Sequence, residues 1–236
     1  MLGTFPLSEI SDTISRIAIA AEGRSAFTGT MNPETPQTVS LGVGPVSIAE
    51  VVAVARHHAR VSITPDAIAE IEASRAVIEA LANDVRPHYG VSTGFGALAT
   101  KHIAREQRVQ LQRSLVRSHA ASSGAEIDAE VVRATMLLRL STMTTGRTGV
   151  RPVVAETYAA LLNADITPIV GEYGSLGCSG DLAPLAHCAL AVMGEGDVRV
   201  AGELMPASAA LKAAGIEPVV LHEKEGLALI NGTDGM

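Results

Sequence analysis

The sequence predicts a mainly α-helical fold, and three observations support this. Apolar residues recur at steps of three and four in several segments between Ser47 and Ile230. Glycine-rich stretches separate these segments, and strands do not alternate with helices as a parallel sheet requires. The chain has 236 residues, 47% of them hydrophobic, which is enough for one large or two small domains with a buried core.

The first helices are predicted from capping signals. Residues 1–45 are rich in proline and polar residues and have little periodicity, so we expect a loose N-terminal extension. Ser47 and Glu50 form a Ser-x-x-Glu capping box at the start of the first helix, SIAEVVAVARHHAR. Thr64 precedes a proline suited to the first turn of a second helix, which ends near Asn83.

The rest of the chain alternates between helical patterns and glycine-rich loops. Residues 88–98, HYGVSTGFGAL, are predicted to be a structured loop. A second such loop, EYGSLGCSGDLAP, runs directly into the apolar pattern LAPLAHCALAVM. Further helices are expected over 105–120, 128–144, 148–163, 207–214 and from 223 to 230, with a short strand over 197–201.

Composition excludes several classes of function. The net charge of −7 argues against binding to a nucleic acid backbone. The longest apolar stretch, Leu182–Met193, falls short of the roughly 20 residues that cross a bilayer, and the first residues do not resemble a secretory signal. Two cysteines cannot make a disulfide framework, so we expect the cytoplasm. His57 and His58 are interpreted as solvated helix residues, and no metal site is predicted.

The glycine-rich loops do not match the known phosphate-binding patterns, because no strand precedes them and no Gly-Lys-Ser/Thr follows. The run GCSGD resembles the nucleophile elbow of a serine hydrolase around Ser179, but Asp181 stands where that motif has glycine. A serine hydrolase stays an alternative at this point. The tripeptide Cys178-Ser179-Gly180 also has the composition that backbone cyclisation needs, since a glycine amide nitrogen is unhindered.

Four motifs together point to a family. GSLGCSGDLAPLAH, YGVSTGFG, LQRSLVRSHA and EGLALINGT resemble, in the same order, motifs of the aromatic amino acid ammonia-lyases. The resemblance runs from about residue 47 to the end, and it is strongest to the histidine-acting branch whose tripeptide begins with Cys in place of Ala. It implies that residues 46–236 are the N-terminal portion of a helical fold of the fumarase/aspartase-like superfamily, and that the full-length protein is a homotetramer.

The resemblance implies a prosthetic group made from the protein itself, with no added cofactor. Cys178, Ser179 and Gly180 would close a 4-methylidene-imidazol-5-one (MIO) ring, a strong electrophile. Asp181 would help to set the geometry of cyclisation. Asn231 would donate a hydrogen bond to the ring oxygen, which the positive end of the following helix would also stabilise.

Two further residues gain roles from the resemblance, and each has an alternative. Tyr89 would be the base that removes the substrate β-proton, whereas the alternative is a tyrosine that anchors its own glycine-rich turn. His119 would bind the substrate ring, whereas the alternative is a histidine that satisfies the end of its helix. A buried imidazole favours a substrate with polar ring atoms.

The implied reaction is the non-oxidative deamination of L-histidine to trans-urocanate and ammonia. Two alternatives remain: a tyrosine or phenylalanine ammonia-lyase or aminomutase of the same family, and a non-catalytic helical module that does not form the ring. The implied partner is the small amino acid substrate, with no nucleic acid or membrane. The chain is roughly half as long as a typical family member and stops soon after Asn231, so we expect a truncated chain that is inactive alone.

Overall fold

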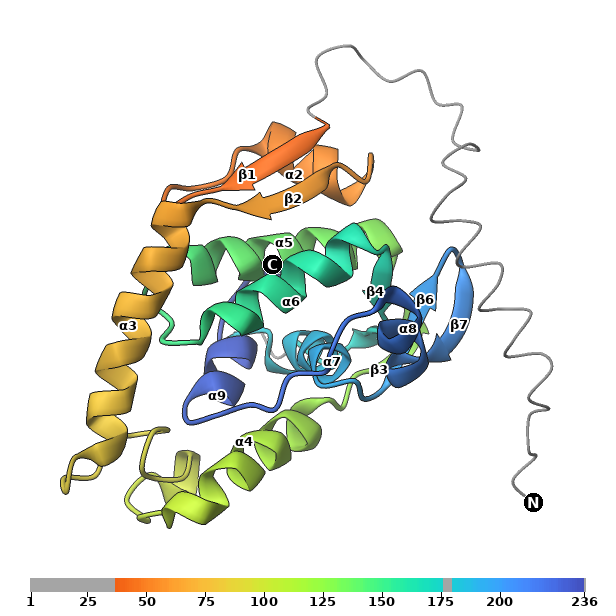
Figure 1. Ribbon diagram of the computed structural model, residues 1–236. Coiled ribbons are helices and arrows are strands. Elements are labelled where there is room, and N and C mark those ends of the chain that lie inside the picture. Colours follow the sequence, from red (N-terminus) through yellow and green to blue (C-terminus); the bar gives the residue numbers. More distant parts are fainter. Residues whose placement is uncertain (1–36, 176–179, 236) are drawn as a thin grey trace, which may run out of the picture.

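The computed structural model describes residues 37–175 and 180–235. Within these ranges the chain is mainly helical, as predicted (Figure 1). Helices α5 (Ala129–Thr144) and α6 (Pro152–Asn163) pack against each other in the middle of the molecule, and α7 (Leu182–Val192) contacts both of them. Helices α4 (Arg105–His119), α7 and α9 (Glu225–Ile230) form a second set of mutual contacts.

The predicted capping box begins helix α2 (Ile48–Ala55). The Ser47 hydroxyl accepts a hydrogen bond from the Glu50 amide at 3.3 Å, and the Glu50 carboxylate accepts one from the Ser47 amide at 2.7 Å. Because α2 ends at Ala55, His57 and His58 lie after the helix and not within it, which corrects the prediction. Both are exposed as expected, and His58 has a positive φ of 53°.

The long helix α3 (Pro65–Asn83) has the predicted bounds and lies along one side of the molecule (Figure 1). Helices α4, α5 and α9 agree with the predictions to within two residues, and α8 (Ala207–Ala214) agrees fully. Helix α6 begins later than predicted, at Pro152, because a proline is favoured in the first turn, where no amide hydrogen is needed.

Short strands account for most of what the pattern missed. Strand β1 (Thr38–Leu41), within the range for which no regular element was predicted, pairs in parallel with β2 (Arg60–Ile63). Strands of three or four residues are too short to show a clear period of two. The others are β3 (Ser123–Glu126) paired with β5 (Gly171–Tyr173), and the antiparallel set β4 (Ile166–Pro168), β6 (Asp197–Val200) and β7 (Glu203–Pro206), of which only β6 was predicted.

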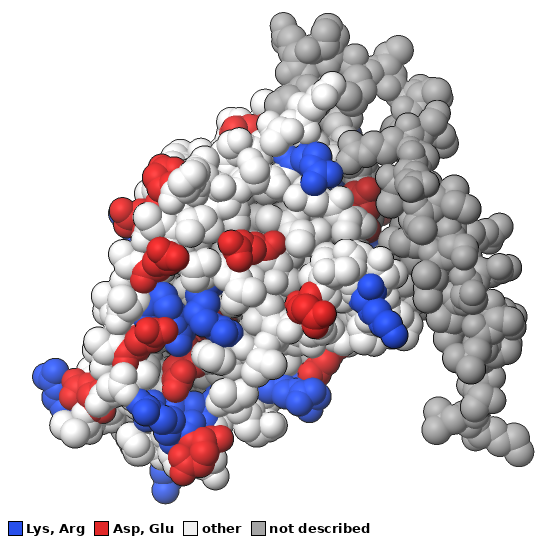
Figure 2. Space-filling view, viewed as in Figure 1, with Lys and Arg blue, Asp and Glu red and all other residues white. Residues whose placement is uncertain are grey.

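The core lies between α5, α6 and α7. Met136, Leu140, Tyr158, Leu161 and Leu185 are fully buried there. Acidic and basic side chains lie intermixed over the side of the molecule on which α3 and α4 are found (Figure 2). No helix in the described residues is long and apolar enough to span a membrane.

Candidate active site

The first glycine-rich loop is a compact turn centred on the carbonyl oxygen of His88. This oxygen accepts hydrogen bonds from the amides of Val91, Ser92 and Thr93 at 3.0 to 3.3 Å. The His88 ring lies 2.9 Å from the Asp84 carboxylate, and this contact, together with Arg86, lowers the pKa of Asp84. The loop therefore follows α3 closely and is held at its start by an ion pair.

Tyr89 lies on the surface of this loop and is 54% exposed. Its ring meets Phe95 edge-to-face, with centroids 6.0 Å apart, and its oxygen accepts a hydrogen bond from the Gly96 amide at 3.4 Å. These are the contacts expected of a tyrosine that anchors its own turn. They also leave the phenol oxygen exposed, as a base needs to be.

His119 is the last residue of α4 and is partly buried. Its Nδ1 lies 2.8 Å from the carbonyl oxygen of Leu115, which can only accept a hydrogen bond, so Nδ1 carries the proton. This contact satisfies the end of the helix, as the alternative interpretation expected. In the neutral ring, Nε2 is then an acceptor, and it has no partner among the described residues.

The second glycine-rich loop is described only at its two ends. Cys178 and Ser179, two of the three predicted ring-forming residues, lie outside the described residues. The third, Gly180, has a φ of +135°, and a Cβ atom there would lie 2.6 Å from the carbonyl oxygen of Gly232. Only glycine fits this position, because both the backbone conformation and the contact exclude a side chain.

Asp181 is 1% exposed and is held from three directions. Its amide donates to the carbonyl oxygen of Gly232 at 2.6 Å. Its carboxylate accepts hydrogen bonds from the Ser175 hydroxyl at 2.6 Å and from the Gly235 amide at 2.8 Å. Asp181 precedes α7 but does not cap it with its side chain, so its hydrogen bonds tie the loop to the end of the chain instead.

Asn231 ends helix α9, and its side chain is exposed. Since the next residue, Gly232, contacts Gly180 and Asp181, the structure brings three of the predicted site residues into one place. The Tyr89 loop reaches the same region, because a Cβ at Gly90 would lie 3.0 Å from Leu227, one turn before Asn231. Among the described residues, no direct contact joins Tyr89 or His119 to Gly180 or Asn231.

Comparison with known proteins identifies the family of the chain. A profile of the aromatic amino acid lyase family matches residues 46–236. The chain belongs to the aromatic amino acid lyase family. It is 60% identical over 200 residues to a histidine ammonia-lyase of Streptomyces coelicolor, an alignment that covers 84% of this chain and 39% of that protein. The chain thus spans about 39% of the length of this curated relative.

Solved structures of the family share the fold. The tyrosine aminomutase of Streptomyces globisporus matches with a TM-score of 0.79 and 40% identity, over 84% of this chain and 37% of that one. The histidine ammonia-lyase of Trypanosoma cruzi matches with a TM-score of 0.77 and 35% identity, over 84% of this chain and 38% of that one.

Sequence reasoning missed several buried polar residues of this chain. Arg139 and Asp234 form a buried ion pair beside the turn that follows Asn231. At the start of α9, the Gln112 side-chain oxygen accepts a hydrogen bond from the Gly226 amide at 2.9 Å. Glu225 is fully buried against Arg151. A signal was present, since Arg139 interrupts an apolar helical stripe, and a charge in such a position requires a buried partner.

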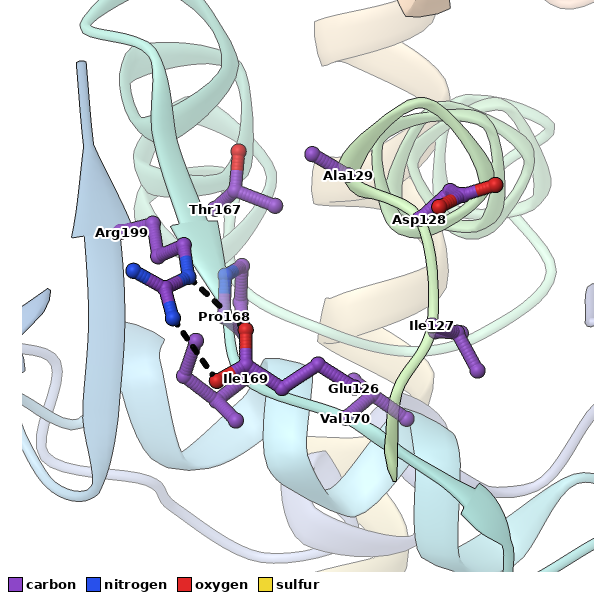
Figure 3. A pocket seen from close by; sticks show the side chains of 9 residues that line it. All are labelled: Glu126, Ile127, Asp128, Ala129, Thr167, Pro168, Ile169, Val170 and Arg199. Carbon is purple, nitrogen blue, oxygen red and sulfur yellow. Dashed lines mark hydrogen bonds and ion pairs between the residues drawn. The ribbon is translucent and has the colours of Figure 1, made fainter. Parts of the chain in front are cut away.

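The chain also has a pocket of about 210 Å³ that these residues do not line (Figure 3). The Arg199 guanidinium and the Glu126 carboxylate face each other across 2.8 Å, and Asp128 lies on the opposite side. None of the predicted site residues lines it, so it is separate from the candidate active site. The lining residues are Glu126, Ile127, Asp128, Ala129, Thr167, Pro168, Ile169, Val170 and Arg199.

Proposed function

We propose that this chain carries the electrophile-forming part of a histidine ammonia-lyase, which converts L-histidine to trans-urocanate and ammonia without oxidation. The observation that carries the proposal is the contact of Gly180 and Asp181 with the turn that follows Asn231. The 60% identity to a protein named histidine ammonia-lyase supports the choice of substrate.

The residues described around Gly180 fit an MIO ring. Cyclisation joins the Gly180 nitrogen to the Cys178 carbonyl carbon with loss of one water, and loss of the Ser179 hydroxyl with its α-proton removes a second. Gly180 is a position that tolerates no Cβ, so its nitrogen is unhindered, and Asp181 is fixed on the downstream side. Once formed, the ring supplies an electrophilic methylidene carbon that converts the substrate amine into a better leaving group.

Tyr89 is proposed to remove the β-proton. A free tyrosine has a pKa of about 10, so a general base of this type requires stabilisation of its phenolate. The Gly96 amide donates a hydrogen bond to the phenol oxygen at 3.4 Å. The edge-to-face contact with Phe95 holds the ring and restricts its movement.

His119 is proposed to bind the substrate imidazole, and Asn231 to donate a hydrogen bond to the ring oxygen of the electrophile. Because Nδ1 of His119 donates to Leu115, Nε2 is the acceptor of the neutral ring. An acceptor suits an imidazole N–H of L-histidine, whereas a phenyl ring offers it no donor. The hydrogen bond at the helix end therefore favours histidine over phenylalanine.

A second candidate, a tyrosine ammonia-lyase or aminomutase, is favoured by the likeness to a tyrosine aminomutase structure and by the phenol of tyrosine, which can also donate to Nε2. To separate them, L-histidine, L-tyrosine and L-phenylalanine are each incubated with the purified full-length protein, and ammonia and the unsaturated acid are measured. Urocanate from L-histidine supports the first candidate. Product from L-tyrosine alone replaces it with the second, and no product from any of the three overturns both candidates.

The assembly and location are also proposed. We propose a cytoplasmic homotetramer for the full-length protein. Large apolar side chains stand exposed at separate places on the surface, among them Ile48, Val85 and Val220, and such residues are suited to burial at subunit contacts. Cys188 is a buried free thiol, which is in keeping with a reducing compartment.

A further inference from the structure

Arg139 reaches from the middle of α5 to the last described turn of the chain. The side chains of Arg139 and Asp234 are 4% and 8% exposed and form an ion pair, with Nε 3.1 Å from the carboxylate. The guanidinium also donates to the carbonyl oxygens of Ala228 at 2.9 Å and Asn231 at 3.2 Å. One side chain thus holds three points of the segment that ends α9.

The other carboxylate oxygen of Asp234 is held as well. The hydroxyl of Thr142 on α5 lies 3.3 Å from it and 3.0 Å from the carbonyl oxygen of Leu138, so the two acceptors share its one proton. A Cβ at Gly232 would overlap the Arg139 guanidinium, so glycine is required for the turn to close over it. The turn from Asn231 to Asp234 is therefore shaped by α5.

The same turn also contacts the glycine-rich loop. The Gly232 carbonyl oxygen accepts a hydrogen bond from the Asp181 amide and lies against Gly180. The Gly235 amide donates a hydrogen bond to the Asp181 carboxylate. A displacement of the turn would therefore move Gly180. Ring closure between groups held at short range is sensitive to such movement, because an error of 1 Å lowers rates by roughly a hundredfold.

We propose that Arg139 and Asp234 are a positioning pair for ring formation, because they fix the Asn231–Asp234 turn that holds Gly180 and Asp181. This inference rests on the proposed function, since it concerns the same electrophile. A pair kept only for packing would be replaceable by apolar residues of similar volume. In this pair, however, the Arg139 guanidinium donates hydrogen bonds to the Asp234 carboxylate and to the carbonyl oxygens of Ala228 and Asn231.

The test compares Asp234→Asn and Arg139→Lys with Arg133→Lys. Arg133 is a matched control because it is also a buried arginine of α5, 2% exposed, but it donates to Val54 and Leu162 and not to the turn. Two quantities are measured in the purified chain: the fraction of molecules that have lost two waters with time, by intact mass, and the exchange of the Asp181 amide hydrogen, by NMR.

We expect both turn variants to lose water at least about tenfold more slowly and to exchange the Asp181 amide faster, while Arg133→Lys keeps both rates near wild type. The inference would be overturned if Asp234→Asn loses water and exchanges the Asp181 amide at the wild-type rates. It would also be overturned if Arg133→Lys slows the loss of water as much as the turn variants do. If the wild-type chain has lost no water, the proposed function fails, and the Asp181 exchange alone decides on positioning. Should Asp234→Asn not fold, Thr142→Val, which removes one hydrogen bond to Asp234, replaces it with the same expected direction.

Discussion

The backbone amide of Asp181 donates a hydrogen bond to the carbonyl oxygen of Gly232 at 2.6 Å and so joins the second glycine-rich loop to the turn after α9. Gly180 lies against the same oxygen. The ring-forming motif and the Asn231 motif, which are far apart in the sequence, are thus held together by backbone atoms that any residue type carries. The side chains around them decide whether the backbones can approach so closely.

The close approach at Gly180 predicts a selective cost for alanine. Gly180→Ala would place Cβ 2.6 Å from the Gly232 oxygen at a φ of +135°, so we expect a loss of about 2 to 3 kcal/mol in the free energy of unfolding by urea. Gly202→Ala is the control, because Gly202 also has a positive φ but no atom within 4 Å of its Cβ position. We expect it to lose only about 1 kcal/mol. Equal losses would show that the contact with Gly232 has no effect.

Glu225 predicts how stability depends on pH. Burial opposes its ionisation, but hydrogen bonds from Arg151 and the His222 amide outweigh this and lower its pKa. A lowered folded pKa means that its contribution is fully present above the unfolded value of about 4.3 and is lost as the pH falls through the folded value.

We therefore expect Glu225→Gln to reduce the free energy of unfolding by about 3 kcal/mol at neutral pH, because it leaves Arg151 without a charged partner. The difference from wild type should shrink below pH 4 in urea titrations, about the unfolded pKa of glutamate. Glu130→Gln is the control, since Glu130 pairs with Arg56 at the surface, where solvent screens the charges, and its loss should change the stability little. If the difference in free energy of unfolding between Glu225→Gln and wild type stays constant with pH, the lowered pKa of Glu225 in the folded state is contradicted.

Tyr89→Phe separates the two roles considered for this residue. The substitution keeps the ring contact with Phe95 and removes only the oxygen that accepts the Gly96 amide. Because the tyrosine is exposed, we expect the free energy of unfolding to change by less than about 0.5 kcal/mol and the loss of two waters to continue, while urocanate release by the full-length protein stops. A large drop in stability with turnover retained would instead identify Tyr89 as an anchor of its turn.

The hydrogen bond from His119 Nδ1 to Leu115 predicts a preference among ligands. With the chain labelled in its histidine nitrogens, we expect the NMR signal of His119 Nε2 to shift on titration with L-histidine, whose ring N–H can donate to it. L-phenylalanine, which has no ring donor, should leave it unchanged. Equal shifts with both amino acids would remove His119 as a determinant of substrate choice.

The helices were predictable because their signals are local. The capping box at Ser47, the proline after Thr64 and the apolar stripes act over a few residues. The structure has the second helix at its predicted bounds and begins the first at its predicted cap, although that helix ends early, at Ala55. The short strands were missed because four residues, as in β1, carry too little periodicity, and their pairing depends on distant partners.

The motifs of the candidate site were predictable from the sequence, but the buried contacts that hold these motifs in place were not. Asp181 and Asn231 stand in recognisable strings, whereas the role of Arg139 depends on a turn that arrives from the other end of the chain. The arginine within an apolar stripe indicated only that a buried partner exists. No local pattern identifies that partner as Asp234, because the contact is made by packing of α5 against the segment after α9.

The intact mass of the purified chain tests the central claim most directly. If Cys178, Ser179 and Gly180 close the ring, the wild-type chain weighs less than its sequence by two water molecules, and Ser179→Ala, which has no hydroxyl to lose, does not show that deficit. Fragmentation should assign the loss to the peptide that contains Gly180. A wild-type mass equal to that of the uncyclised sequence would contradict the account, because the electrophile would then be absent.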